Sequence, residues 1–312
     1  FRSIDWDIHA AEKGGYEHFM LKEIHEQPKA VRDTISPRIH ENEIDLGEIG
    51  MTDEEIKNLR KISIVACGSA YHTGAAGKYV IEELARIPVE TDLASEFRYR
   101  NPIYQENSLV IIVSQSGETA DSLAALRDAK AHGCKVLSIV NVVGSSIARE
   151  SDAVLYTWAG PEISVATTKA YSCQLAVFYL LALKFAQIRS AITPDTFQTL
   201  LTALKQLPDQ IEGLLSQKEK IQFFANHYLA TEHIFFMGRG IDYAISMEGS
   251  LKLKEISYIH SEAYAAGELK HGTISLMEEG TLVVALATQD ALYPKTVSNM
   301  IEVKTRGAFV MA

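Results

Sequence analysis

A run rich in hydroxyl side chains is the part of the sequence best suited to hold an anion. It reads Val113-Ser114-Gln115-Ser116-Gly117-Glu118-Thr119. The run follows an apolar stretch that predicts a strand, and it precedes residues 120–132, which predict a helix. In a parallel sheet, ligands bind beyond the carboxyl ends of the strands, where helix N–H groups carry partial positive charge. Three hydroxyls and an amide close together, with Gly117 permitting close backbone approach, therefore predict a phosphate site.

Helix capping is the simpler interpretation of the same run. Ser116 and Thr119 are residue types that often accept a hydrogen bond at the start of a helix. Capping accounts for one hydroxyl and leaves the others unexplained. A second strand end, at Cys67, Gly68 and Ser69, is expected at the same sheet edge and extends the wall of the pocket. Cys67 is interpreted as a small buried apolar residue rather than as a nucleophile.

A second set of chemically capable residues lies later in the chain. Lys252 and Glu255 are three apart on a helix predicted from about residue 242 to residue 259, so they share a face. Such a pair is usually a solvated surface pair. His271 lies in a glycine-containing loop, where a histidine can open a sugar ring or shuttle a proton near neutral pH. A lone histidine in a loop is more often structural.

The elements that must position these residues follow one repeating pattern. Short apolar runs at 62–66, 109–113 and 136–143 alternate with helical stretches, which predicts an α/β fold with a mainly parallel sheet flanked by helices. Landmarks of this pattern return in the same order about 170 residues later, as expected for an internal repeat. Two copies of one flavodoxin-like nest are therefore predicted.

The second copy differs from the first at the position of the hydroxyl run. Its turn reads Ala287-Thr288-Gln289-Asp290. The turn has fewer hydroxyls, and its acid would repel a phosphate, so only the first copy is expected to bind the anion. The sequence stops soon after a strand predicted at 309–311, and the second domain is expected to be truncated at its C-terminal end.

The repeat and the segments around it predict four parts of the chain. They are a helical lead-in at 1–60, a first domain at 61–190, a helical connection at 191–230 and a second, incomplete domain at 231–312. Two prolines are expected to interrupt helices, Pro28 in the lead-in and Pro208 in the connection.

Composition limits the classes of function. The net charge is -10 and no cluster of Lys and Arg interrupts it, so nucleic acid is excluded as an expected partner. Three cysteines suit neither a disulfide framework nor a zinc site, which predicts a reducing, cytoplasmic compartment and no metal. The most apolar stretch, 170–186, carries polar residues and is short for a membrane span, so a buried helix is predicted. The chain begins with Phe1 rather than Met and is expected to be part of a longer protein.

Five motifs resemble one known family. They are Ala66-Cys67-Gly68-Ser69, Ser95-Glu96-Phe97-Arg98-Tyr99, Ser114-Gln115-Ser116-Gly117-Glu118-Thr119, Lys252-Leu253-Lys254-Glu255-Ile256-Ser257-Tyr258-Ile259-His260 and Glu262-Ala263-Tyr264-Ala265-Ala266-Gly267-Glu268-Leu269-Lys270-His271-Gly272. They resemble the isomerase half of the glutamine:fructose-6-phosphate aminotransferase family, which consists of two sugar isomerase (SIS) domains. The resemblance covers nearly the whole chain.

The resemblance implies a reaction. Fructose 6-phosphate and ammonia from glutamine would become glucosamine 6-phosphate, on the route to UDP-N-acetylglucosamine, without a cofactor or a metal. Glucose 6-phosphate would bind the same site. The family's glutaminase domain and its C-terminal tail with a Schiff-base lysine do not occur in the sequence, so this piece is expected to be inactive in the full reaction.

The resemblance also implies residue roles. The phosphate loop falls on Ser114, Gln115, Ser116 and Thr119, and the sugar would be lined by Cys67, Gly68 and Val165. Ala70 stands where the family commonly has a serine, so Ser69 is expected to compensate. Glu255 matches the base that moves a proton between C1 and C2, and Lys252 matches a residue that stabilises enolate-like charge. His271 matches a ring-opening histidine supplied by the partner subunit, which implies a homodimer.

Two other functions are compatible with parts of the sequence. A non-catalytic sugar-phosphate sensor of the SIS type needs the hydroxyl run but has no use for Lys252, Glu255 and His271. A related deglycase or aminosugar-phosphate deaminase would keep both the run and the glutamate. The long motif that ends at Gly272 favours the aminotransferase.

Overall fold

The computed structural model describes residues 12–312, and the chain divides after Leu215 into two compact units. The helices of the first unit are α1 (Phe19–Ile35), α2 (Asp53–Asn58), α3 (Gly68–Leu84), α4 (Ala94–Phe97), α5 (Ala120–Ala131), α6 (Ser146–Glu150), α7 (Lys169–Ile188) and α8 (Pro194–Leu215), with short 3-10 turns at Ser36–Arg38 and Gly47–Ile49. Its strands are β1 (Ile39–His40), β2 (Glu43–Ile44), β3 (Lys61–Ala66), β4 (Val89–Leu93), β5 (Ser108–Ser114), β6 (Lys135–Val140) and β7 (Ala153–Tyr156).

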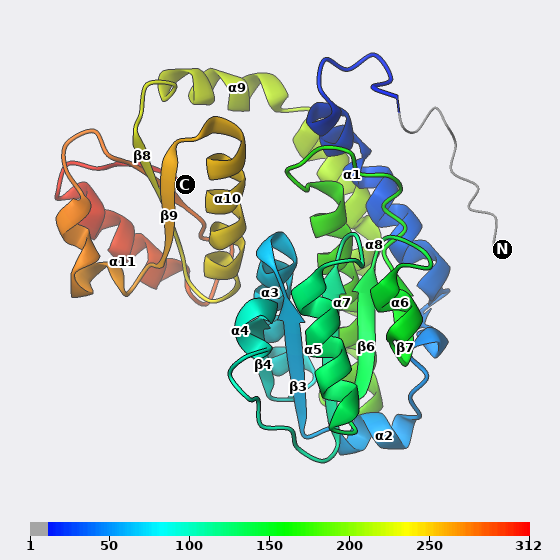
Figure 1. Cartoon of the computed structure of the whole chain (residues 1–312). Coiled ribbons are helices and arrows are strands. Elements are labelled where there is room, and N and C mark those ends of the chain that lie inside the picture. The colour runs from blue at the N-terminus through cyan, green and yellow to red at the C-terminus, as the bar shows by residue number, and fades with distance from the viewer. Residues whose placement is uncertain (1–11) are drawn as a thin grey trace. The chain divides into compact units, whose positions relative to one another are not determined.

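Five strands of the first unit form one sheet, with the order β4-β3-β5-β6-β7 within the described residues. All four pairings are parallel; Ile64, for example, pairs with Thr91 on one side and Ile111 on the other. In chain order of the sheet strands this is 2-1-3-4-5, the flavodoxin-like arrangement. The predicted α/β class and parallel sheet are confirmed (Figure 1).

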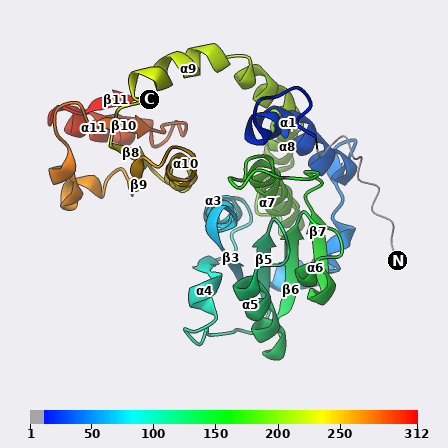
Figure 2. The same ribbon diagram turned by 45° about the horizontal axis from the view of Figure 1, so that its top comes forward.

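Helices cover both faces of this sheet (Figures 1 and 2). One face carries α4, α5 and α6 over a core that includes Val65, Phe97, Ile112 and Leu126. The other face carries α3 and α7, which pack side by side, and α1 and α8 pack against α7. The α7 helix is long and apolar enough to span a membrane by composition alone, but 67% of its apolar window is buried, as expected for the predicted core helix.

Proline interrupts neither of the two helices in which a break was predicted. Pro28 lies inside α1 and Pro208 lies inside α8. A proline cannot donate to the carbonyl four residues earlier. In α1 the side chain of Gln27 donates to that carbonyl, the oxygen of Ile24, at 3.1 Å, so the helix continues. The predicted breaks were therefore wrong, whereas the interruption near residue 192 lies between α7 and α8.

The second unit repeats the pattern of the first. Its helices are α9 (Lys218–His227), α10 (Ile241–Ser257) and α11 (Tyr293–Lys304), with 3-10 turns η4 (Leu269–His271) and η5 (Thr273–Leu276), and its strands are β8 (His233–Gly238), β9 (His260–Ala265), β10 (Leu282–Ala285) and β11 (Phe309–Met311). Within the described chain, four parallel strands form a sheet in the order β9-β8-β10-β11. This is the 2-1-3-4 order of the first sheet.

Two helices lie on opposite faces of the second sheet (Figure 1). Phe235, Met237 and Val283 point into a core shared with Val303 of α11. Phe236, the residue between the first two, packs against Gly249 of α10 on the other face. The boundaries predicted at residues 60, 190 and 230 stay predictions, because the structure shows only a division after Leu215.

Candidate functional site

The strand order of the first unit singles out one position for a ligand. Strands β3 and β5 are neighbours, but their crossover helices α3 and α5 lie on opposite faces. In doubly wound sheets, ligands bind in the crevice beyond the carboxyl ends of two such strands. Both helices begin at this crevice, at Gly68 and Ala120. Their N-cap residues, Cys67 and Thr119, make no side-chain capping hydrogen bond. Two helix N-termini therefore present N–H donors and partial positive charge to the same place.

Hydrogen bonds within the hydroxyl run shape the loop after β5. Ser114 Oγ accepts from the N–H of Gly117 at 3.0 Å and lies 3.2 Å from Thr119 Oγ1. Ser116 Oγ accepts from the N–H of Glu118 at 3.2 Å. An accepting hydroxyl keeps its own hydrogen, so Ser116 retains a donor for an anion. Thr119 occupies the N-cap position without capping through its side chain, so the capping interpretation does not explain this residue.

The loop after β5 contacts the start of the short helix α6, at Ser145 and Ser146. Gly117 has a positive φ of 67°, and a Cβ there would lie 2.0 Å from Ser145 Oγ, so only glycine fits. The carboxylate of Glu118 is bound at the start of α6, where it accepts from the N–H of Ser146 at 2.8 Å. Hydrogen bonds from the side chain and backbone of Ser146 lower the pKa of Glu118. The one acid in the run is therefore held where it does not oppose an anion.

The other predicted residues of the first copy border the same crevice. Gly68 has a φ of 55°, and a Cβ at this position would meet no atom within 4 Å. Cys67 is half-buried, with Sγ 3.9 Å from Ser122 Oγ. Ser69 is half-buried in the first turn of α3. Val165 lies just before α7, whose N-terminus is beside that of α3, and its side chain is 100% exposed. The structure thus places these residues around one open end of the sheet.

The equivalent crevice of the second unit is closed by its own side chains. Asp242, in the first turn of α10, is only 4% exposed. Its carboxylate accepts from the N–H of Thr288 at 3.0 Å and from Thr288 Oγ1 at 2.6 Å. Gln289 donates to the backbone oxygen of Arg239 at 2.6 Å. The acid predicted to exclude phosphate, Asp290, is exposed; the buried acid in the crevice is Asp242.

Lys252 and Glu255 are brought together on α10. The ammonium of Lys252 contacts the carboxylate of Glu255 and lies 3.5 Å from Glu248 Oε1. The side chains of Lys252 and Glu255 are 17% and 33% exposed, and that of Glu248 is 6% exposed. The pair is therefore more enclosed than the solvated surface pair that its spacing alone suggests.

His271 lies apart from this pair. It is the last residue of η4, whose Leu269 belongs to the core on the α11 face of the sheet, whereas α10 covers the other face. The histidine is exposed, and its backbone N–H donates to the oxygen of Glu268 at 2.9 Å. Within one chain, His271 therefore does not lie beside Lys252 and Glu255.

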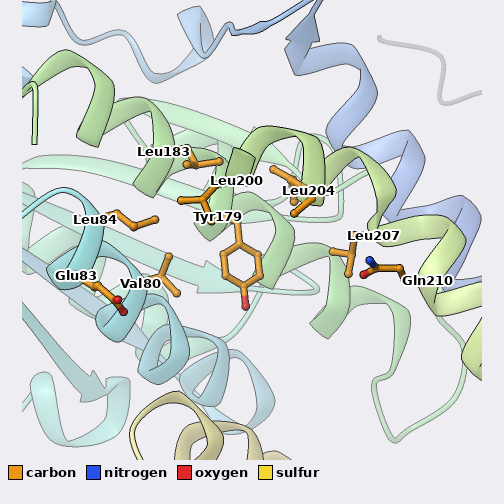
Figure 3. Close-up of a pocket in the computed structure, with 10 residues that line it drawn as sticks. Val80, Glu83, Leu84, Tyr179, Leu183, Leu200, Leu204, Leu207 and Gln210 are labelled. Atoms are coloured by element: carbon orange, nitrogen blue, oxygen red, sulfur yellow. The ribbon is translucent and has the colours of Figure 1, made fainter. Parts of the chain in front are cut away.

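A pocket elsewhere in the first unit lacks the chemistry of a phosphate site. Its volume is about 380 Å³, and it lies beside the C-terminal halves of α3 and α7, facing α8. Val80, Tyr179 and Leu204 line it, with Glu83 and Gln210 at its ends (Figure 3). The apolar lining and the distance from the helix N-termini separate it from the candidate site. No group of metal-binding side chains occurs among residues 12–312, and the absence of a metal or cofactor stays a prediction.

Two residues of these sites escaped the sequence interpretation. Asp242 resembles any acid in the first turn of a helix. The sequence feature that could have indicated its role is its alignment with Ala70 of the first copy. Glu118 was treated only as part of the hydroxyl run. Its position four residues after the strand gave no indication that it caps another helix, because α6 lies about 30 residues later.

The comparison with protein families decides the classification. The model of the SIS domain matches residues 55–184 and 228–312. The chain belongs to the SIS domain family. The two matched ranges contain the two parallel sheets, and the first SIS copy contains the open crevice.

Relatives of this SIS protein carry one name. Glutamine-fructose-6-phosphate aminotransferase (isomerizing) of Caldanaerobacter subterraneus subsp. tengcongensis is 60% identical over 310 residues, which are 99% of this chain and 51% of the relative. The protein of the same name from Clostridium acetobutylicum is 60% identical over 309 residues, with the same coverage. This chain therefore spans about half the length of these curated relatives.

A solved structure corresponds to nearly the whole chain. It is the C-terminal domain of glucosamine-fructose-6-phosphate aminotransferase from Francisella tularensis, with 42% identity and a TM-score of 0.92. The similarity covers 96% of this chain and 84% of that chain. The SIS chain thus matches the C-terminal, isomerase portion of the relatives, as the motifs predicted.

Proposed function

We propose that this chain is the isomerase half of a glutamine-fructose-6-phosphate aminotransferase. In this role it converts fructose 6-phosphate, with ammonia derived from glutamine, to glucosamine 6-phosphate for UDP-N-acetylglucosamine synthesis. The observation that carries the proposal is the open crevice of the first copy. There, two helix N-termini and the loop after β5 form an anion site that the second copy lacks.

The proposed chemistry divides between the two copies. The first copy holds the phosphate through Ser114, Gln115, Ser116 and Thr119. Glu255 of the second copy moves the proton between C1 and C2, since aldose–ketose conversion needs a carboxylate that accepts and returns one proton. The ammonium in contact with this carboxylate supplies positive charge near a developing oxyanion.

The proposed assembly is a cytoplasmic homodimer. Ring opening needs an acid–base group such as His271, but this residue lies on the opposite face of the second sheet from Glu255. A second subunit that places its histidine beside Glu255 would complete the set of acid–base groups. A glutaminase domain, joined to this half in the longer protein, would supply the ammonia.

Calorimetric titration with fructose 6-phosphate, glucose 6-phosphate and glucosamine 6-phosphate tests the proposal. We expect saturable binding of all three, weakened about tenfold by Ser116→Ala through loss of one hydrogen bond to a charged group. Ser151→Ala, at the opposite edge of the sheet, is the control and should bind as the wild type does. Failure of the wild type to bind any of the three sugars would overturn the proposal.

A further inference from the structure

The loop between β7 and α7, residues 157–168, is fixed at both ends although its tip is exposed. At its start, Asn141 Oδ1 accepts from the N–H of Ala159 at 2.9 Å, and Asn141 Nδ2 donates to the oxygen of Gly160 at 2.8 Å. At its end, Glu162 Oε1 accepts from the N–H of Thr168 at 2.8 Å. Such anchoring holds the loop in one conformation.

The middle of the loop is held by a buried carboxylate from a distant part of the chain. Glu23 of α1 is 2% exposed. Its Oε1 accepts from the N–H of Ile163 at 2.6 Å and from the N–H of Ser164 at 3.1 Å. These two amides immediately precede Val165, so the carboxylate sets the position of the peptide that carries it.

The arrangement is costly for a purely structural contact. Burial raises the pKa of Glu23, although the two loop N–H groups act in the opposite sense. Its second oxygen, Oε2, is buried without a hydrogen-bond partner among the described residues. An exposed loop could satisfy its amides with water. Here a buried carboxylate bonds the two amides instead, and it thereby fixes their direction. The next residue, Val165, is apolar and fully exposed.

The position of the loop tip connects it to the candidate site. Helices α3 and α7 pack side by side and both begin at the carboxyl edge of the first sheet. Thr73 of α3 donates to Gln174 of α7 at 3.3 Å, which joins their second turns. The phosphate donors lie on the neighbouring loop after β5. The loop tip and the phosphate donors therefore lie at the same edge of the sheet.

We propose that Glu23 is a positioning residue for the sugar portion of a phosphorylated sugar, acting through residues 163–165. The proposal rests on the function proposed above and adds to it that the lead-in helix α1 is part of the binding site. Glu23 sets how the sugar is held, whereas the loop after β5 and the two helix N-termini hold the phosphate.

Two ligands separate the two roles. Glucose 6-phosphate, measured by calorimetry, reports on sugar and phosphate together, and inorganic phosphate, measured by ³¹P NMR, reports on the phosphate loop. Glu23→Leu removes the acceptor and should raise the Kd for glucose 6-phosphate at least about tenfold, with the Kd for phosphate within about twofold. Glu23→Gln keeps one acceptor oxygen and should bind both within about threefold. Glu17→Leu, an exposed position just before α1, is the control.

Each result has one meaning. Wild-type affinity for glucose 6-phosphate in Glu23→Leu would overturn the proposal, as would an equal loss for both ligands, which indicates a general structural effect. If Glu23→Leu does not fold, Glu23→Asp replaces it, because its carboxylate is one methylene too short to reach the loop. Absence of glucose 6-phosphate binding by the wild type would instead contradict the proposed function, a result distinct from any of these.

Discussion

The two SIS copies share a backbone and differ in what fills their crevices. In both, a glycine with nearly the same φ follows the first strand, 55° at Gly68 and 56° at Gly240. Two residues later the first copy has Ala70 and the second has Asp242. In the first copy the loop hydroxyls bond within their own loop, and in the second the loop amide and hydroxyl of Thr288 bond the carboxylate of Asp242.

The difference shows what the crevice is built to hold. The second copy supplies its own negative group, which takes an N–H and an O–H donor from the loop after its third strand. The first copy offers the same kind of donors with only a methyl group at the corresponding position. On the proposed function, the fold provides a place for an anion twice, and in the second copy the carboxylate of Asp242 occupies it.

The largest expected effect tests the division of chemistry between the copies. Glu255→Gln should lower proton exchange at C1 of fructose 6-phosphate by roughly 10²–10⁴-fold, because an amide cannot act as the base. Phosphate binding should stay within a few-fold. Deuterium incorporation from D₂O measures the exchange, with Glu262→Gln as the control. Exchange at the native rate would show that Glu255 is not the base.

The next effect would convert the first crevice into the second. Ala70→Asp places a carboxylate beside the two helix N-termini, where it should repel phosphate and take its donors. At an effective dielectric of 20, like charges about 4 Å apart repel by about 4 kcal/mol, so we expect at least a 100-fold loss of sugar-phosphate affinity. Ala70→Ser is the uncharged control. Unchanged calorimetric affinity in Ala70→Asp would mean that the anion binds elsewhere.

The reverse change should destabilise the second copy. Asp242→Ala removes the two hydrogen bonds that this buried carboxylate accepts from Thr288 and should cost about 2 kcal/mol of unfolding free energy for that unit. Urea unfolding followed by amide exchange in β10 would measure it. Asp290→Ala changes an exposed acid in the same loop and should be neutral. Equal stability of the two variants would exclude the internal-anion interpretation.

The smallest effect concerns the support under the first loop. The pKa of Glu118 is lowered by its hydrogen bonds with Ser146, so its contribution to folding is present above the ordinary pKa of glutamate and is lost as pH falls through the lowered value. We expect exchange protection of the Ser146 amide to fall in this acidic range in the wild type. Glu118→Gln should remove the pH dependence, and Glu106→Gln should keep it. Protection in the wild type that does not change with pH would contradict this role.

The sequence was sufficient where local patterns and repetition carry the information. Apolar runs and the spacing of their helices predicted both sheets, and the hydroxyl run was recognisable because Ser114 to Thr119 lie within one loop. The same local reasoning failed at Pro28, because the hydrogen bond that compensates for the proline comes from the side chain of Gln27, in a role that its residue type does not reveal.

The remaining features depend on contacts between distant residues. Glu23 is an ordinary polar residue of a helix until α1 packs against α7, and its partners lie about 140 positions later. The role of Asp242 as the acceptor for Thr288 becomes apparent only when the two crevices are compared. The placement of His271 away from Glu255 likewise follows from which face of the second sheet each element covers, a property that residue spacing does not encode.

The long-range hydrogen bonds of Glu23 also limit when the protein can fold during its synthesis. Its partner amides, Ile163 and Ser164, are translated about 140 residues later, and at about 5–20 residues per second this takes roughly 7–28 s. During that interval α1 has left the ribosome without α7, the helix that will cover its apolar side. The contact between Glu23 and the loop before α7 can therefore form only near the end of the synthesis of the first SIS copy.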